Sequence, residues 1–300
     1  MKRGAVFGIA AMLCFALCAC ANQPSANTAE TTAPATESRI EETTMNPTPE
    51  KTEIKELSVE YNGGLIYGKA YIADVNQKSP LVIMSHGLGA NHQRVADYAR
   101  DLQKNGYSSY IFDFPNGSSP FLENKSGTDT TKMSVMTEVD ALEAVYAAAK
   151  TWDFADFSRV YLLGESQGGL VASLVAMNHP GELSGLLLLY PGFNIPDYVR
   201  NNFDSLDDVP SEYDIFGWIT VGKIYAEDVW DLDVYSGLQN YQGRTLIIHG
   251  DNDEVVDVSY SEIADEVMPD CELYILNGAG HGFSGEYFDS AMETILEFMN

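Results

Sequence analysis

A serine flanked by glycines is the first feature of this sequence that could do chemistry. The pentapeptide Gly164-Glu165-Ser166-Gln167-Gly168 follows an apolar run at 159–163 and precedes a helical pattern at 168–174. A Gly-x-Ser-x-Gly segment between a strand and a helix is typical of a nucleophile elbow, where glycines fit a turn too tight for larger residues. The sequence therefore predicts that Ser166 is a nucleophile at a helix N-terminus, where developing negative charge is favoured.

A serine hydroxyl becomes a nucleophile only when a neighbouring base takes its proton and a third group orients that base. In enzymes with a nucleophile elbow, an acid and then a histidine follow the serine, each on a loop after a strand. The acid is expected after the strand pattern at 245–249, where Asp251 and Asp253 are available. Of the five histidines, His281 alone lies downstream of that segment, in a glycine-rich loop. We therefore expect His281 to be the base.

The tetrahedral intermediate of such a reaction needs two backbone N–H donors for its oxyanion. One is expected from Gln167, the residue after the nucleophile. The other is expected from Leu88 in His86-Gly87-Leu88-Gly89, directly after the strand pattern at 81–85. We interpret His86 as a structural support of that loop, because no Cys, Asp or Glu joins it at a metal-ligand spacing. Neither a metal ion nor another cofactor is expected.

Strand and helix patterns alternate around these segments. Continuous apolar runs, typical of strands buried on both faces, occur at 81–85, 109–112, 160–164, 186–190, 245–249 and 273–276. Asn62-Gly63-Gly64, between runs at 57–61 and 65–72, indicates a hairpin. The pattern predicts an α/β-hydrolase fold, with a mostly parallel sheet and helices on both of its faces.

The clearest helix is expected at about 133–150, and further helices are expected after Gly168, Tyr260 and Phe283. The first of these helices has an apolar face with three- and four-residue spacing, made by Met136, Val139, Leu142, Val145 and Tyr146.

An aromatic and acidic insertion at about 193–241 interrupts the alternation. A connection of this length is rarely structureless, and functional lids are a common explanation. The alternative is a helical decoration that packs its aromatic side chains onto the core.

From about residue 81 to its end, the chain resembles cinnamoyl and feruloyl esterases of anaerobic gut bacteria, within the serine aminopeptidase-like α/β-hydrolases. The resemblance rests on the segments 86–89, 133–140, 164–169, 249–256 and 278–283. Only Asp253 fits the His-Gly-x-x-Asp-x-x-Val pattern of these enzymes, so the resemblance makes Asp253 the triad acid and Asp251 a turn residue. It also makes the insertion a small cap over the active site, with Tyr225 and Trp218 as substrate contacts.

Three positions depart from the pattern of those esterases. The family usually has His where this chain has Glu165 and an aromatic residue where it has Leu88. The segment 112–117 also lacks the usual Gly-His-Gly after Asp-Phe. Because these positions border the acyl site, the resemblance implies hydrolysis more firmly than feruloyl specificity.

The first residues have the pattern of a signal for export. Lys2 and Arg3 precede a short apolar run that ends in Leu17-Cys18-Ala19-Cys20, which resembles a bacterial lipobox. Residues 1–19 are therefore expected to be a lipoprotein signal peptide, with Cys20 lipidated and the protein anchored outside the cytoplasm. An ordinary secretory signal is the alternative. Residues 20–53 are rich in Thr, Pro and Glu and predict a disordered tether, which leaves 54–300 for the hydrolase domain.

The chain is strongly acidic, with a formal net charge of −27 that becomes more negative once Lys2 and Arg3 are removed. Such a surface repels nucleic acids, so we expect no nucleic-acid partner and contact with a membrane only through the lipid anchor. Cys271 is interpreted as a lone structural thiol, because a free cysteine usually behaves as a small apolar residue.

These features together predict a serine hydrolase that cleaves carboxylic esters, with short-acyl or hydroxycinnamoyl esters favoured, through an acyl-enzyme intermediate. A peptidase or lysophospholipase of the same fold is one alternative. A catalytically silent surface binding protein that keeps the fold is another.

Overall fold

The computed structural model describes residues 51–300 of the chain. The predicted signal peptide, the predicted lipidation site Cys20 and nearly all of the predicted tether lie outside the described residues. The first strand begins at Glu53, just before the predicted start of the domain. Within 51–300, the helices are all too short or too polar to cross a membrane.

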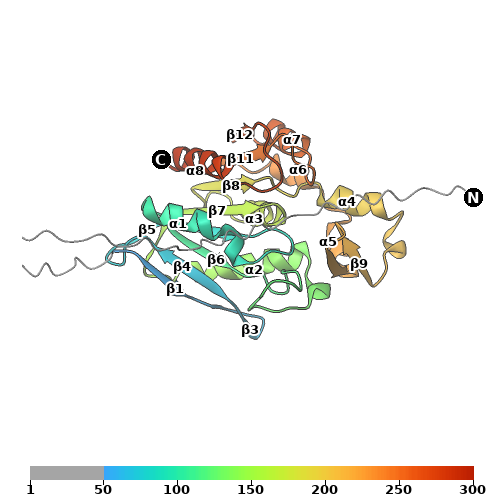
Figure 1. Ribbon diagram of the computed structural model, residues 1–300, viewed down its shortest axis with the longest axis horizontal. Helices are drawn as coiled ribbons and strands as arrows, with labels where there is room; N and C mark the ends of the chain where they lie inside the picture. The colour runs from blue at the N-terminus through green and yellow to red at the C-terminus, as the bar shows by residue number, and fades with distance from the viewer. Residues whose placement is uncertain (1–50) are drawn as a thin grey trace, which may run out of the picture. The chain divides into compact units, whose positions relative to one another are not determined.

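An eight-stranded sheet forms the centre of the molecule (Figure 1). Its strands, in spatial order, are β1 (Glu53–Glu56), β4 (Gly68–Ile72), β6 (Ser108–Phe112), β5 (Ser79–Ser85), β7 (Ala155–Glu165), β8 (Gly185–Leu189), β11 (Thr245–Gly250) and β12 (Cys271–Leu276). The pairs β1–β4 and β4–β6 are antiparallel, and the pairs from β6 to β12 are parallel. The predicted α/β-hydrolase architecture is confirmed.

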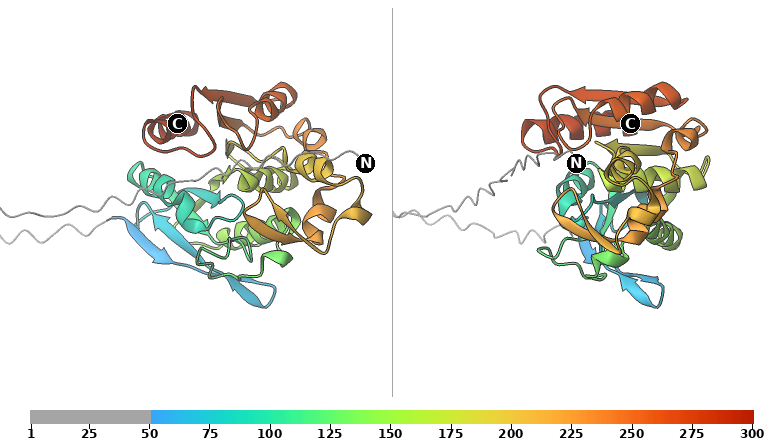
Figure 2. Two further views of the ribbon diagram at one scale, coloured as in Figure 1. Left: turned by 45° about the vertical axis from the view of Figure 1, so that its right-hand side comes forward. Right: turned by 90° about the vertical axis from the view of Figure 1, so that its right-hand side faces the viewer.

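Helices cover both faces of this sheet (Figure 2). One face packs against α1 (Ala96–Lys104) and α8 (Glu286–Met299), and the other packs against α2 (Val135–Ala149), α3 (Gln167–Asn178) and α7 (Ser259–Val267). The side chains of β5 alternate between the two cores, because successive residues of a strand point to opposite faces. This double burial explains why the central strands are continuous apolar runs in the sequence.

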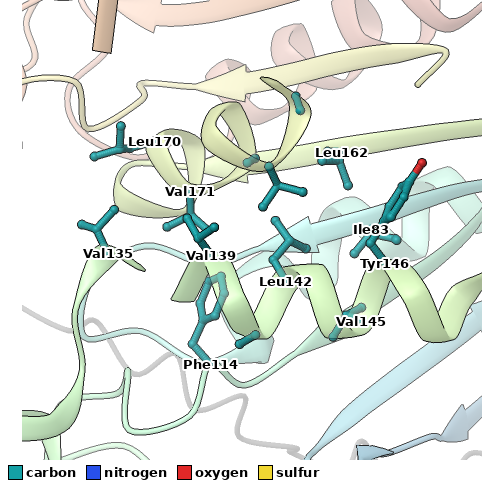
Figure 3. Close-up of a cluster of buried hydrophobic side chains, with 14 of the residues drawn as sticks. Ile83, Phe114, Val135, Val139, Leu142, Val145, Tyr146, Leu162, Leu170 and Val171 are labelled. Carbon is teal, nitrogen blue, oxygen red and sulfur yellow. The ribbon is translucent and has the colours of Figure 1, made fainter. Parts of the chain in front are cut away.

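Helix α2 begins with a capping box, in which the Ser134 side chain accepts from the N–H of Thr137 and the Thr137 side chain accepts from the N–H of Ser134. Its apolar face packs under α3 and β7, as Figure 3 shows for Val139 and Leu142. The prediction was wrong for Met136, which is exposed. Val135, one position earlier, is buried in its place, so the apolar stripe is rotated relative to the predicted one.

The predicted hairpin is present but shorter than expected. Its strands are β2 (Val59–Tyr61) and β3 (Gly64–Ile66), joined through Asn62 and Gly63, which both have positive φ. The predicted second strand at 65–72 divides in two, because β3 pairs only with β2 whereas β4 joins the large sheet.

The insertion between β8 and β11 is structured throughout. It contains α4 (Ile195–Asn202), η3 (Leu206–Asp208), β9 (Glu212–Ile215), β10 (Ile219–Gly222), α5 (Lys223–Val229) and α6 (Val234–Leu238). The hairpin of β9 and β10 rests on η2 (Thr130–Lys132), where the Thr130 hydroxyl donates to the carbonyl of Thr220 at 2.6 Å. Most of the aromatic residues of the insertion are buried or partly buried in the core.

Candidate active site

Ser166 lies on a sharp turn between the end of β7 and the start of α3. Its backbone has φ 52° and ψ −123°, a left-handed conformation that is strained for a residue with a side chain. The turn is held from a neighbouring strand, because the Ser166 N–H donates to the carbonyl of Leu189 at 2.9 Å. The side chain is thereby presented at the N-terminus of α3.

The glycines of the pentapeptide are required by close backbone packing. A Cβ atom on Gly168 would lie 2.5 Å from the carbonyl oxygens of both Ser85 and His86 at the end of β5. A Cβ atom on Gly164 would collide with the carbonyl of Gly168 across the turn. A side chain at Gly168 would therefore push the turn away from β5, and a side chain at Gly164 would force the turn itself open.

Three predicted residues form one chain of hydrogen bonds. The Ser166 Oγ lies 2.9 Å from His281 Nε2, and His281 Nδ1 lies 2.8 Å from Asp253 Oδ2. Because an ionised carboxylate can only accept, Nδ1 carries the ring proton and Nε2 is left to accept from the serine hydroxyl. Asp251, the alternative acid, instead accepts from the N–H of Gly278 at 2.6 Å.

Asp253 is held in its ionised form although its side chain is buried. Burial raises the pKa of Asp253, but hydrogen bonds from His249 and His281 lower it by more, and the net pKa lies well below its usual range. The second oxygen of the carboxylate accepts from the N–H groups of Val255 and Val256 at 2.8 and 2.9 Å. Asp253 is therefore fixed in orientation as well as in charge.

His249 is a contributor to this site for which the sequence supplied no role. Its Nε2 lies 2.9 Å from the carbonyl of Val256 and 3.3 Å from Asp253 Oδ2, while Nδ1 lies 2.6 Å from the Ser261 hydroxyl. Because a carbonyl can only accept, Nε2 carries the proton and faces the carboxylate. The signal was its position four residues before Asp253, at the end of β11.

The two predicted oxyanion donors flank the serine. Gln167 is the first residue of α3, and Leu88 follows Gly87, where an added Cβ would lie 3.1 Å from Ser166 Cβ. In the part of the chain that the structure describes, neither the Leu88 N–H nor the Gln167 N–H has a hydrogen-bond partner. Two unpaired backbone donors beside a serine side chain can receive an oxyanion.

His86 supports the Leu88 loop. It is fully buried, its Nδ1 lies 2.9 Å from the Gly87 carbonyl, and its Nε2 accepts from the Phe114 N–H at 3.1 Å. Burial lowers the pKa of His86, so the ring is neutral at pH 7. No cluster of three metal-binding side chains occurs between residues 51 and 300.

Glu165, where the resembling esterases usually have His, belongs to a buried network behind the site. Its carboxylate accepts from the Tyr190 hydroxyl at 2.6 Å and pairs with Arg94 Nε at 3.2 Å. The Tyr190 ring packs edge-on against His281, with 4.8 Å between the ring centroids. Glu165 therefore supports the histidine side of the site through Tyr190.

Tyr225 and Trp218, the predicted substrate contacts, have different surroundings. Tyr225 is fully buried in α5, and its hydroxyl donates to the Gln167 side chain at 2.6 Å. Its side chain is therefore not accessible to a substrate in this structure. Trp218 lies in the turn between β9 and β10 and is 50% exposed. The neighbouring Ile219 lies beside Gly89, in the segment 86–89 that contains the predicted donor Leu88.

Comparison with known proteins agrees with the fold. The family model of the serine aminopeptidases, S33, matches residues 76–219. Est1E from Butyrivibrio proteoclasticus superposes with a TM-score of 0.70 at 22% identity, over 81% of this chain and 98% of Est1E. Est1E with bound ferulic acid superposes with a TM-score of 0.72 at 22% identity, over 81% of this chain and 99% of that one.

Two curated proteins are also similar in sequence. A 2-hydroxy-6-oxononadienedioate/2-hydroxy-6-oxononatrienedioate hydrolase from Pseudomonas sp. is 22% identical over 80% of this chain and 95% of its own length. A proline iminopeptidase from Thermoplasma volcanium is 28% identical over 52% of this chain and 48% of its own. The chain thus belongs to the α/β-hydrolase fold class. Within that class it resembles the cinnamoyl and feruloyl esterases and matches the S33 model over residues 76–219.

The packing of Gly168 against β5 leads to a test of the turn. We expect Gly168→Ala to lower the free energy of unfolding by about 3 kcal/mol or more, because its new methyl group meets backbone oxygens that cannot rotate away. Gly64→Ala is the matched control, since its nearest neighbour would lie at an ordinary 3.7 Å. Denaturant titration of both variants measures the difference, and equal stability would contradict the packing argument.

Proposed function

We propose that this protein is a serine hydrolase that cleaves carboxylic esters through an acyl-enzyme on Ser166. The observation that carries the proposal is the hydrogen-bonded chain from Asp253 through His281 to Ser166, beside the unpaired N–H groups of Leu88 and Gln167. Nucleophile, base, orienting acid and oxyanion donors are the parts that acyl transfer needs.

In the proposed first half-reaction, Ser166 Oγ attacks the ester carbonyl carbon while its proton passes to His281 Nε2. The oxyanion accepts hydrogen bonds from the backbone N–H groups of Leu88 and Gln167. The C–O bond to the alcohol then breaks, and His281 returns the proton to the leaving oxygen. The alcohol departs and the acyl group remains on Ser166.

In the second half-reaction, water gives a proton to His281 Nε2 and attacks the acyl carbonyl carbon. The bond from that carbon to Ser166 Oγ then breaks, His281 returns the proton to Ser166 Oγ, and the acid departs. Asp253 stays ionised throughout and stabilises the protonated imidazole of His281. The low pKa of Asp253 suits this role, because a protonated acid could not stabilise a cation.

We further propose that the acyl group is short or hydroxycinnamoyl. The cap places Trp218 and the partly buried Phe216–Tyr198 pair, whose ring centroids are 4.1 Å apart, at the hairpin whose Ile219 lies beside Gly89. An exposed aromatic ring on the hairpin that contacts Gly89 suits a flat, apolar acyl group.

The S33 match and the similarity to a proline iminopeptidase favour one second candidate, cleavage of an N-terminal residue from a peptide. The same residues would then protonate an amine leaving group. Rates on p-nitrophenyl esters and on amino-acid p-nitroanilides distinguish the two candidates. Faster turnover of the anilides would favour the peptidase.

Substitution of the three residues tests the mechanism. We expect Ser166→Ala to abolish hydrolysis of p-nitrophenyl acetate and labelling by a fluorophosphonate. By analogy with the equivalent change in a serine protease, Asp253→Asn should lower kcat roughly 10⁴-fold.

Two controls match these changes. Ser173→Ala removes another buried hydroxyl of α3, one that donates to the carbonyl of Gly169. Asp251→Asn alters the alternative acid. Both should retain activity close to that of the wild type. Fast hydrolysis by Ser166→Ala, or absence of fluorophosphonate labelling in the wild type, would contradict the serine mechanism, and the latter would favour the silent binding protein.

Trp218 provides a test of the acyl preference. We expect Trp218→Ala to lower kcat/KM for methyl ferulate roughly tenfold, corresponding to about 1.4 kcal/mol of lost contact with the aromatic acyl group, and to leave p-nitrophenyl acetate little changed. Leu65→Ala, at a similarly exposed apolar residue of the β2–β3 hairpin, is the control. Equal losses on both esters would contradict a role in acyl selection.

We also propose that the protein is exported and anchored to a membrane by lipid on Cys20. The support is the sequence Leu17-Cys18-Ala19-Cys20 after a short apolar run. In bacterial cells, Cys20→Ser should move the protein from the membrane fraction to the soluble fraction, whereas Cys271→Ser, which removes a free thiol of the folded domain, should not. Retention of the Cys20 variant in the membrane would contradict the anchor.

A further inference from the structure

A buried glutamate lies behind the proposed oxyanion hole. Glu138 of α2 is 1% exposed, and its Oε2 accepts from the side-chain Nε2 of Gln167 at 2.8 Å. Its Oε1 is buried and has no hydrogen-bond partner in residues 51–300. A carboxyl group in these surroundings is unusual, because burial of a charge without a paired cation is costly.

The Gln167 side chain is held at both of its ends. Its Oε1 accepts from the Tyr225 hydroxyl at 2.6 Å, and its Nε2 donates to Glu138. All three side chains are buried. The amide therefore connects α5 of the cap to α2 of the main domain, and it belongs to the residue whose backbone N–H faces the proposed oxyanion.

Glu138 also contacts the support of the second donor. A Cβ atom on Gly117 would lie 2.8 Å from Glu138 Oε1, so the carboxyl group packs directly on Gly117. The Gly117 carbonyl accepts from the N–H of Gly89 at 3.0 Å, and Gly89 follows Leu88. One carboxyl group thus bonds the Gln167 side chain directly and is linked to the Leu88 segment through Gly117.

From these contacts we propose that Glu138 is a positioning residue, which holds the Leu88 and Gln167 donors in register through Gly117 and the Gln167 side chain, and that it must be uncharged to do so. This inference rests on the proposed function. It adds to it a residue that contacts neither the substrate nor the three residues of the hydrogen-bonded chain.

The surroundings of Glu138 favour its neutral form. Burial raises the pKa of Glu138 to about 8, against a smaller lowering by the hydrogen bond from Gln167. The proton then lies on Oε1, because Oε2 accepts from the amide. Tyr225 faces the carboxyl group from α5 and stays neutral, since burial raises its pKa well above the ordinary value. The α3 and Gly117 segments contribute no charged side chain at these contacts.

Ionisation of Glu138 would oppose the reaction. A negative charge behind the two N–H donors would repel the negative charge that develops on the substrate oxygen, in a setting where water screens little. The wild-type kcat should therefore fall above about pH 8, by roughly tenfold for each further pH unit.

Glu138→Gln tests this inference, because glutamine is a neutral group of the same shape. We expect this variant to keep wild-type kcat at pH 7 and to lose the decrease above pH 8. Glu138→Ala should lower kcat at least roughly tenfold with KM little changed, because Gln167 Nε2 is left unpaired and the donors are free to shift. Glu143→Gln, on the same helix but bound to His179 and Asn178, is the matched control and should keep the wild-type pH profile.

Thermal unfolding provides a readout that does not depend on activity. The ordinary pKa of Glu138 is 4.5 and its folded pKa is about 8, so the folded protein retains a proton that the unfolded chain releases between those values. The wild type should lose stability relative to Glu138→Gln as the pH rises from about 4.5 to 8, and the difference should be constant above 8.

The outcomes separate this inference from the proposed function. Loss of activity in Ser166→Ala establishes the hydrolase, and an alkaline decrease that persists in Glu138→Gln then overturns the role of Glu138 alone. An unfolding difference that does not change between pH 4.5 and 8 overturns it as well, whether or not any ester is cleaved. Wild-type kcat in Glu138→Ala would overturn the positioning role.

Discussion

The left-handed turn at Ser166 is the constraint on which the other features depend. Its carbonyl oxygen accepts from the N–H groups of Gly169 and Gly192, at 2.9 and 2.7 Å, while its N–H donates to Leu189. These bonds tie the end of β7 to the segment after β8, and contact with β5 fixes the turn from the other side. A residue held this tightly can keep a strained conformation that an isolated peptide would leave.

Two buried carboxyl groups near that turn have opposite charge states: Asp253 is ionised and Glu138 is neutral. Asp253 receives two backbone N–H groups and two histidine N–H groups, which together keep it charged despite burial. Glu138 receives one amide N–H, which is too little to offset burial, so it is neutral at pH 7. The number of donors, rather than the residue type, decides the charge. In the proposed mechanism a negative charge is useful beside the imidazole and harmful beside the oxyanion.

The cap contacts the candidate active site at two places. Tyr225 acts from inside the protein, through the side chain of Gln167, while the β9–β10 hairpin lies over the Gly89 loop and presents Trp218 to solvent. Among the aromatic residues of the insertion, Trp218 is exposed, whereas the others are buried or partly buried against the core.

The sequence by itself determined the central strands, the main helices and the positions of Ser166 and His281, because these follow from local apolar periodicity and from glycines that only a tight turn requires. The choice of Asp253 over Asp251 came from the resemblance to the esterases. Tertiary structure alone decided that Met136 is exposed, that Tyr225 binds Gln167, and that His249, Glu165 and Glu138 surround the site. Each of these features depends on which side chains from distant segments come into contact when the chain folds. The spacing of residues along the chain does not reveal such contacts. The charges of Asp253 and Glu138 depend on their burial and on the number of hydrogen-bond donors around each carboxyl group, and both are set only when the chain folds.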